Sequence, residues 1–352
     1  MFGFLLTTLS AAQPPPPVTT LASALLKRVA DAQVSAARVD LAAAERAAVR
    51  VAADPFALRL PRLQARHALS DARAALQSAL FAAQLTTQDA YFGVLEAADA
   101  VRLAERALEH ADTTLGATQI RFEAGAATVV EVGRARNALR GATRDLDAER
   151  TRGRLATAQL AARLGMAAET LSLQEPTTDP VVPKLGEVLA RSQNNQEVRA
   201  AAQALEEARV YLAGVDNAFS ARTEVEGAQV AFRAARTALA ERRRSVALAV
   251  RSAHSEALAF RDALQAAGDA DATEEAALEV QQARFDGGSI SRLELMQAEL
   301  DAATSTAALR RARHELARTV SGLEGVVRGS AGVFASSDAG IFTEGVDDAF
   351  GE

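Results

Sequence analysis

Few residues of this 352-residue sequence have the types and spacing that catalysis or metal binding requires. The four histidines, His67, His110, His254 and His314, are far apart without ligand spacing, so we expect solvated helix positions rather than a metal site. The absence of cysteine excludes disulfides, thiolate metal sites and a cysteine nucleophile. No P-loop or GxGxxG motif is present. We therefore predict no catalytic residue, no metal and no cofactor, and an enzyme is the weakest interpretation.

The most informative spacing belongs to a stretch that occurs twice. Both copies read R-F-[ED]-x-G-x-x-[ST]-x-x-E-[VL]-x-x-A, and the second lies 163 positions after the first. The first copy begins at Arg121 and the second at Arg284. A glycine that interrupts a helical pattern at the same place in two copies indicates a bend. We predict that Gly125 and Gly288 are the bends of two helical hairpins.

Two kinds of side chain in the repeated stretch have a purely structural interpretation. Glu131 and Glu294 lie about one turn after the bends, where the helix macrodipole favours acids. Arg121-Phe122 and its counterpart Arg284-Phe285 could form a helix-terminal staple, with the phenylalanine packed and the arginine solvated. A direct role of these residues in a functional site is the alternative to the structural interpretations.

The composition predicts a mainly α protein. Nearly half of the residues are apolar, but aromatic residues make up only 4% and tryptophan is absent. Alanine and leucine are strong helix formers and suit closely packed helices. The net charge of -6 is spread over the chain, and no basic stripe interleaved with aromatics is present, so nucleic-acid binding is disfavoured.

Helical periodicity divides the sequence into two similar halves. Each half reads as a helix, a short β-hairpin, a long helix, a glycine bend and a return helix. The sequence pattern therefore predicts a fold of duplicated long coiled-coil helical hairpins. The expected parts are a signal-like segment with a proline linker at 1–18, a first repeat at 19–170, a linker at 171–184, a second repeat at 185–324 and a flexible tail at 325–352.

Short alternating runs predict the two β-hairpins. The first pairs 48–53 with 56–60 around Asp54-Pro55, and the second pairs 210–215 with 219–226 around Asp216-Asn217. Strands of five to eight residues are short against the about 9–11 residues of a membrane-spanning strand.

The N-terminus has two interpretations. Phe2 to Leu9 is apolar, and Ser10-Ala11-Ala12 supplies the small residues of a cleavage site. No lysine or arginine precedes Lys27, so the positive region of a signal peptide is missing. We expect a secretory signal, with an apolar tail as the alternative.

The two motif copies, the run AYFGVLEA at 90–97 and the internal repeat resemble the TolC-like outer-membrane efflux proteins. The resemblance covers about residues 19–325. It implies a TolC-like α-barrel protomer and a homotrimer that forms one tunnel in the outer membrane with a large periplasmic part. It also implies two further partners, a periplasmic adaptor (membrane-fusion) protein and an inner-membrane pump.

The same resemblance implies two sites. The periplasmic tips that dock the adaptor would be Gly125, Ala126, Ala127, Gly288, Ser289 and Ile290. The tunnel entrance or gate would hold Glu131, Glu294, Gln297 and Phe285. A ring of such acids in three chains would favour cations, and mutual repulsion would raise the pKa of its carboxylates.

The predicted function is a passive exit duct of a tripartite efflux or secretion system. The alternative is a non-conducting coiled-coil structural protein of the cell envelope. The length of the two hairpins and the continuity of their apolar face discriminate between the two.

Overall fold

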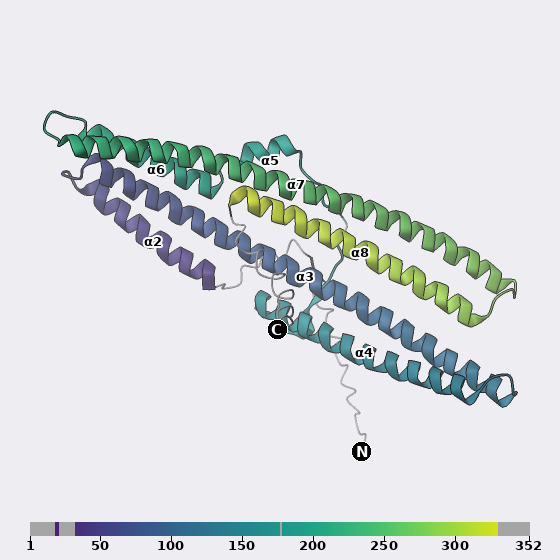
Figure 1. Cartoon of the computed structure of the whole chain (residues 1–352). Coiled ribbons are helices and arrows are strands. Elements are labelled where there is room, and N and C mark those ends of the chain that lie inside the picture. Colours follow the sequence, from purple (N-terminus) through teal and green to yellow (C-terminus); the bar gives the residue numbers. More distant parts are fainter. Residues whose placement is uncertain (1–17, 21–31, 177, 330–352) are drawn as a thin grey trace, which may run out of the picture.

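Long helices account for nearly all of the residues that the structure describes. The computed structural model describes residues 18–20, 32–176 and 178–329 (Figure 1). Two helices of 65 residues each, about 98 Å long at 1.5 Å per residue, run the length of the molecule. The elements in chain order are β1 (Val18–Thr19), α2 (Ala32–Ala53), α3 (Arg59–Glu123), α4 (Val129–Leu164), a 3-10 turn (Ala168–Thr170), β2 (Ser172–Leu173), α5 (Leu185–Ser192), α6 (Gln196–Val215), α7 (Arg222–Asp286) and α8 (Arg292–Arg328).

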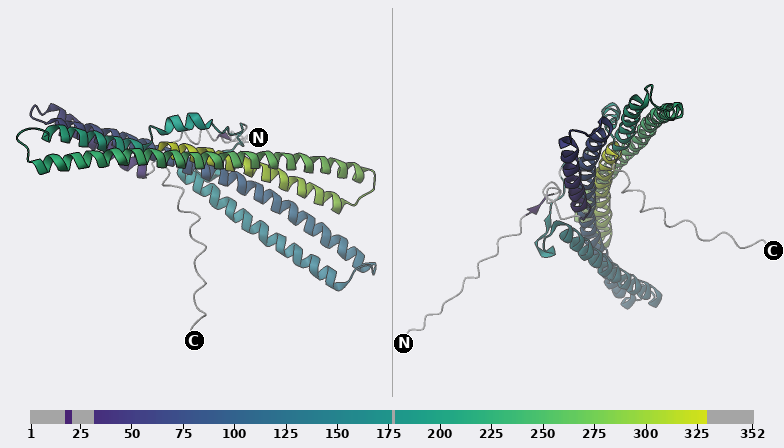
Figure 2. Two further views of the ribbon diagram at one scale, coloured as in Figure 1. Left: turned by 45° about the horizontal axis from the view of Figure 1, so that its top comes forward. Right: turned by 90° about the vertical axis from the view of Figure 1, so that its left-hand side faces the viewer.

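The helices lie side by side in one curved layer, which the end-on view of Figure 2 shows most clearly. In the half that contains the glycine bends, the neighbours are α4, α3, α8 and α7 in that order. In the opposite half, α2 lies on α3, and α6 lies between α3 and α7. One edge of the layer is therefore formed by α2 and α4, and the other by α7.

The expected mainly α fold and its duplication are present in the helices. α2, α3 and α4 of the first half correspond to α6, α7 and α8 of the second. The return helix of the first half is α4, and Gly165 ends it in the left-handed conformation with φ of 62°. α8 continues to Arg328, beyond the expected end of the second repeat at 324. The signal-like segment and most of the tail lie outside the described residues.

The two predicted β-hairpins are wrong. Residues 48–53 are the last two turns of α2, and 210–215 are the end of α6. The chain then reverses in short turns at 54–58 and 216–221, and α3 and α7 begin immediately afterwards. The alternating runs are short and rich in alanine, leucine and arginine, so they also continue the apolar stripe of a helix. The described strands are two residues each, and they pair in parallel, Val18 with Ser172.

Two clusters of buried side chains hold the middle of the layer together. The larger joins α5, α6, α7 and α8 through Val188, Val198, Val246, Val250 and Leu323, among others. The smaller joins α3 to the end of α4 through Tyr91, Phe92, Leu160 and Leu164. Leu171 and Leu173 of the linker pack on this second cluster. The long helices are thus fixed at their middle, and their two ends project away from it.

Candidate functional site

The two glycine bends have the same backbone geometry. Gly125 has φ of 73° and Gly288 has φ of 69°, in the left-handed region that favours glycine. Ala126 N donates to Arg121 O at 2.7 Å, and the counterpart Ser289 N donates to the carbonyl at 284 at 2.8 Å. Each of these hydrogen bonds closes a loop of six residues. In each bend the glycine N–H also donates to the carbonyl oxygen three residues earlier, and the two bonds together define a Schellman motif. The bends are confirmed, and both lie at one end of the molecule (Figure 1).

Each bend leads directly into a capping box. Thr128 N donates to Glu131 Oε2 at 2.6 Å, and Glu131 N donates to Thr128 Oγ1 at 3.3 Å. Ser291 and Glu294 make the same pair of bonds at 2.7 and 3.3 Å. The duplicated glutamates therefore serve as helix N-terminal acids, as the structural interpretation of the sequence has it.

The capping boxes also set the charge of the two glutamates. The backbone N–H of Thr128 lowers the pKa of Glu131, and the threonine hydroxyl lowers it further. The N–H and hydroxyl of Ser291 lower the pKa of Glu294 in the same way. Both carboxylates are exposed and negatively charged at neutral pH in the single chain. The raised pKa expected of a trimeric ring stays a prediction, because it depends on neighbouring copies.

The remaining predicted site residues lie around the same two bends. Ala126 and Ser289 are exposed, and Ala127 and Ile290 are half-buried. Gln297 is exposed, and its amide donates to Asp301 Oδ1 at 2.8 Å.

The phenylalanines differ between the two bends. Phe285 is half-buried, whereas Phe122 is 46% exposed, so the staple that would pack the phenylalanine is incomplete at the first bend. Each bend brings together the site residues of one copy of the repeated motif. Glu131 and Glu294 belong to different motif copies and remain on separate hairpins.

A charged cluster that was not predicted from the sequence lies at the middle of the molecule. His314 on α8 is only 1% exposed, and its ring stacks on Phe92 at 4.4 Å between centroids. Its Nδ1 lies 3.1 Å from Glu96 Oε1, and its Nε2 lies 2.8 Å from Glu175 Oε1 in the linker. Arg318 Nη1 donates to the same Glu96 oxygen at 2.8 Å. The cluster ties α3, α8 and the linker together.

Two opposing effects act on the pKa of His314. Burial alone would lower it, but the hydrogen bonds and charges of Glu175 and Glu96 together raise it above its ordinary value. For Glu96, burial would raise the pKa, and His314 and Arg318 outweigh that effect and lower it. We infer an imidazolium between two carboxylates. No spacing in the sequence signals this cluster, because its members come from three segments that are far apart in the chain.

The prediction that the four histidines occupy solvated helix positions is wrong for two of them. His314 is buried, and His254 is 9% exposed with its Nε2 3.0 Å from the carbonyl oxygen of Pro183. His67 is half-buried and lies 2.8 Å from Glu207 Oε1 of α6. In each case the ring contacts a segment distant in sequence, which local periodicity cannot show. Within the described ranges, no group of histidine and acidic residues could hold a metal ion.

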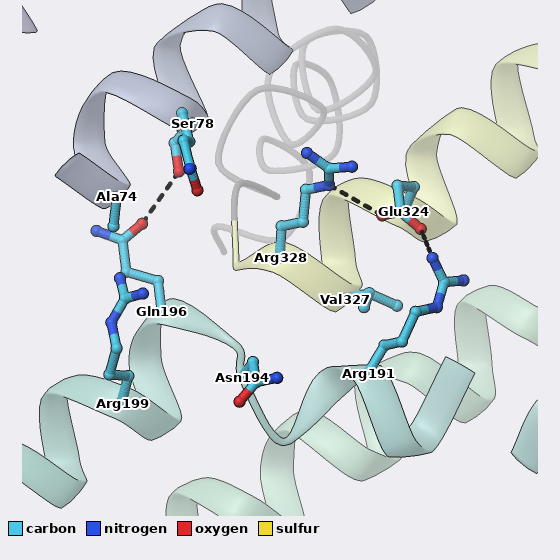
Figure 3. A pocket seen from close by; sticks show the side chains of 10 residues that line it. Ala74, Ser78, Arg191, Asn194, Gln196, Arg199, Glu324, Val327 and Arg328 are labelled. Carbon is cyan, nitrogen blue, oxygen red and sulfur yellow. Dashed lines mark hydrogen bonds and ion pairs between the residues drawn. The ribbon is translucent and has the colours of Figure 1, made fainter. Parts of the chain in front are cut away.

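An open hollow of about 240 Å³ lies where α3 meets the turn between α5 and α6 (Figure 3). Arg191 and Arg328 both donate to Glu324, at 2.7 and 2.9 Å. Ser78 Oγ donates to Gln196 Oε1 at 3.2 Å across the same hollow. Most of the polar groups drawn there bond to one another, so the hollow is a junction between the two repeats.

The edge helices of the layer expose large apolar side chains, and among the interior helices Ile120 and Phe122 of α3 and Tyr211 of α6 are also exposed. Those on the edge formed by α2 and α4 are Val39, Val49, Val129, Val130 and Leu155. Those on the α7 edge are Val230, Leu248 and Val280. Among the described residues of the central helix α8, no large hydrophobic side chain is exposed. None of the described helices combines the length and hydrophobicity that a membrane crossing requires.

A curved layer of long antiparallel helices with paired glycine tips is the fold of the TolC-like channel protomers. The family model described as "Outer membrane efflux protein" matches residues 54–166, from the first turn through the first glycine tip to the end of α4. The predicted resemblance is confirmed over this segment by sequence and over most of the chain by fold. No curated protein matches the sequence.

Solved structures of outer-membrane channels share the fold at low identity. The chain is similar to the outer membrane protein VceC from Vibrio cholerae, with 14% identity, 88% of this chain and 96% of that chain covered, and a TM-score of 0.61. It is also similar to the CmeC outer membrane channel of Campylobacter jejuni, with 12% identity, coverage of 92% and 91%, and a TM-score of 0.59. For the open state of the Neisseria gonorrhoeae MtrE outer membrane channel, the identity is 16%, the coverage is 88% of each chain and the TM-score is 0.58.

Proposed function

We propose that three copies of this chain form a hollow exit duct, a passive conduit of a tripartite efflux or secretion system. The observation that carries the proposal is the curved single layer with apolar side chains on both of its edges. An edge that exposes valines and leucines gains free energy when a neighbouring copy covers it. Because the two edges differ, the contact is head-to-tail, and rotation about one axis closes it into a ring. The number of copies, three, follows from the resemblance to the TolC-like proteins, which the family match supports.

The glycine tips are the proposed docking end. Gly125, Ala126 and Ala127 on the first hairpin, and their counterparts Gly288, Ser289 and Ile290, would contact a periplasmic adaptor protein. The support is geometric, since both tips project from the same end of the molecule and carry small side chains around a fixed backbone turn.

The proposed entrance lies just behind the tips. Glu131 and Glu294 from three chains would place six carboxylates near the axis, and Gln297 and Phe285 would line the same region. Such a ring favours cations and repels anions. The capping boxes support the role, because they fix each carboxylate and keep it charged.

The duct acts without chemistry of its own in this proposal. It needs no cofactor, and the inner-membrane pump supplies the energy of transport. The chain would sit at the outer membrane with its long helices in the periplasm.

A second candidate is a non-conducting coiled-coil protein of the cell envelope. It is favoured by one observation, the replacement of both predicted hairpins by short turns between helices. A trimer that scaffolds the envelope needs the same edges and tips but no open path.

Conductance across a planar bilayer distinguishes the two candidates. The duct predicts channel steps from the purified trimer, and Glu131→Ala with Glu294→Ala should change the conductance or weaken the cation preference. The matched control is Glu241→Ala, an exposed acid on α7 far from the tips, which should leave both unchanged. A wild-type trimer with no channel activity would favour the scaffold.

A further inference from the structure

The end opposite the glycine tips carries a second duplicated feature. Phe56 in the first turn and Phe219 in the second are 163 positions apart, the same offset as the glycine bends. Asp54 Oδ1 accepts a hydrogen bond from Phe56 N at 2.9 Å, and Asn217 Oδ1 accepts one from Phe219 N at 2.9 Å. The two phenylalanines are exposed, with residue exposures of 89% and 100%. Both turns lie at the same end of the molecule (Figure 1).

An open hollow adjoins the first turn through Ala57. It measures about 510 Å³ between the end of α2 and the start of α3. Its apolar wall consists of Ala48, Val51, Ala52, Ala57 and Ala65. Its polar rim consists of Arg59, Arg62 and Arg66, which the spacing of three and four places on one face of α3.

The three arginines of this hollow have no carboxylate partner within the described part of the chain. Arg62 Nη2 donates to the backbone oxygen of Asp54 at 2.9 Å, and no ion pair forms at Arg59 or Arg66. The carboxylate of Asp54 is already occupied by the N–H of Phe56. α3 begins at Arg59 without a side-chain cap, so the free N–H groups of its first turn add to the positive potential.

The charge of the surrounding sequence has the same sign. Residues 46–66 contain five arginines and one acid, whereas the equivalent residues 209–229 contain two arginines and three acids. At the start of α7, the counterparts of Arg62 and Arg66 are a valine and a glutamine, and the remaining Arg222 pairs with Glu226 at 2.9 Å. The second turn therefore has the exposed ring but lacks the cationic hollow.

We propose that the first turn is a docking site for the anionic phospholipid headgroups of a bilayer surface. Unpaired guanidinium groups bind phosphate in a planar, bidentate geometry. The alanine and valine wall contacts the glycerol and upper acyl region beneath the headgroup, and the arginine stems cover apolar surface while their charged ends reach the phosphate. Phe56 and Phe219 insert at the interfacial level, as amphipathic surface anchors do. The chain thus contacts the membrane surface through helical turns, and this contact is independent of conduction.

The inference is tested by vesicle co-sedimentation of the full-length protein at low ionic strength. The expected result is binding to phosphatidylglycerol vesicles that far exceeds binding to phosphatidylcholine vesicles and that weakens in high salt. Arg59→Gln with Arg66→Gln keeps Arg62 and the turn it stabilises. At about fivefold per arginine, this double variant should bind phosphatidylglycerol about 25-fold more weakly. The matched control, Arg209→Gln with Arg222→Gln on the two helices that flank the second turn, removes the same charge and should change binding less than threefold.

Two further measurements distinguish phospholipid headgroups from other occupants of the first turn. Phe56→Ser and Phe219→Ser should each weaken binding to both kinds of vesicle, because their contribution does not depend on lipid charge. Inorganic phosphate at millimolar concentration should leave the binding to vesicles largely intact. Equal binding of the Arg59/Arg66 variant and the wild type to phosphatidylglycerol would overturn the proposal. Full displacement of the protein from vesicles by free phosphate would also overturn it. If the Arg59/Arg66 variant lost self-association while its vesicle binding stayed unchanged, the occupant would be a second copy of the chain, and the proposal would be wrong.

Discussion

Tyr91 and His254 occupy equivalent positions on α3 and α7, at the same offset that separates the two glycine bends, and both hold the linker between the two repeats. Tyr91 Oη donates to the carbonyl oxygen of Gln174 at 2.6 Å. His254 Nε2 lies 3.0 Å from the carbonyl oxygen of Pro183. The duplicated position therefore binds the two ends of one segment, which fixes how the first repeat is connected to the second.

Removing the tyrosine hydroxyl tests this arrangement. Tyr91→Phe should lower the free energy of unfolding by about 1–2 kcal/mol, because the hydroxyl is buried and also accepts from Gln174 N at 3.1 Å. Urea denaturation measures the change. The control is Tyr211→Phe, whose exposed hydroxyl makes one bond to Glu224 at 3.3 Å. As a surface substitution, it should change the free energy of unfolding by at most about 0.5 kcal/mol. Equal effects of the two substitutions would contradict a structural role for the linker contact.

The His314 cluster predicts a pH-dependent stability. The folded-state pKa of His314 is raised above the ordinary 6.5, so its contribution is complete below about pH 6.5 and is lost as the pH rises through the folded-state pKa. The folded-state pKa of Glu96 is lowered from 4.5, so its contribution is present above that value and is lost as the pH falls through the folded-state pKa.

His314→Gln should therefore destabilise the protein by about 2–3 kcal/mol at pH 6 and by less at alkaline pH. Thermal melts between pH 6 and pH 10 measure the difference. His110→Gln is the control, because His110 is half-buried and its side chain makes no hydrogen bond or ion pair among the described residues. A stability difference between wild type and His314→Gln that stays constant over this range would show that His314 is neutral in the folded protein.

The left-handed bends predict a strict glycine requirement. Gly125→Ala or Gly288→Ala should each cost about 1–2 kcal/mol, because a Cβ is unfavourable at positive φ even where space is open. The control is Gly133→Ala in the interior of α4, where a Cβ meets no atom within 4 Å and alanine should stabilise the helix by up to about 1 kcal/mol. Chemical denaturation of the three variants checks the opposite signs.

The capping boxes predict a loss of helix stability at the tips. Thr128→Ala should cost about 1 kcal/mol, and Ser291→Ala should cost a similar amount. Hydrogen exchange should rise in the first turn of α4 or α8, respectively, because the cap no longer satisfies an N–H group. The depressed pKa of Glu131 and Glu294 adds stability above about pH 4.5 that is lost as the pH falls through the folded-state values. Unchanged exchange in Thr128→Ala would mean that the cap contributes nothing.

The sequence predicts the features that are local and periodic. The glycine bends, the return helices that follow them and the long helices follow from helical spacing and from the repeated motif. The prediction of two β-hairpins fails because a short alternating run around an Asp-Pro or Asp-Asn turn is also compatible with two helix ends. Only tertiary packing decides between a hairpin and two helix ends.

The missed features depend on segments far apart in the sequence. His314, Glu96 and Glu175 are brought together only when the linker crosses α3 and α8. Arg59 belongs to a run that the sequence predicts to be a strand, and most of the apolar wall beside Arg59, Arg62 and Arg66 comes from α2.

End-on electron microscopy of the purified protein tests the central claim most directly, because it reports both the number of copies and whether they enclose a space. The account predicts threefold particles with three times the 36.9 kDa mass of one chain and an open centre surrounded by one layer of helices. Single chains, or a threefold bundle with a solid centre, would contradict it.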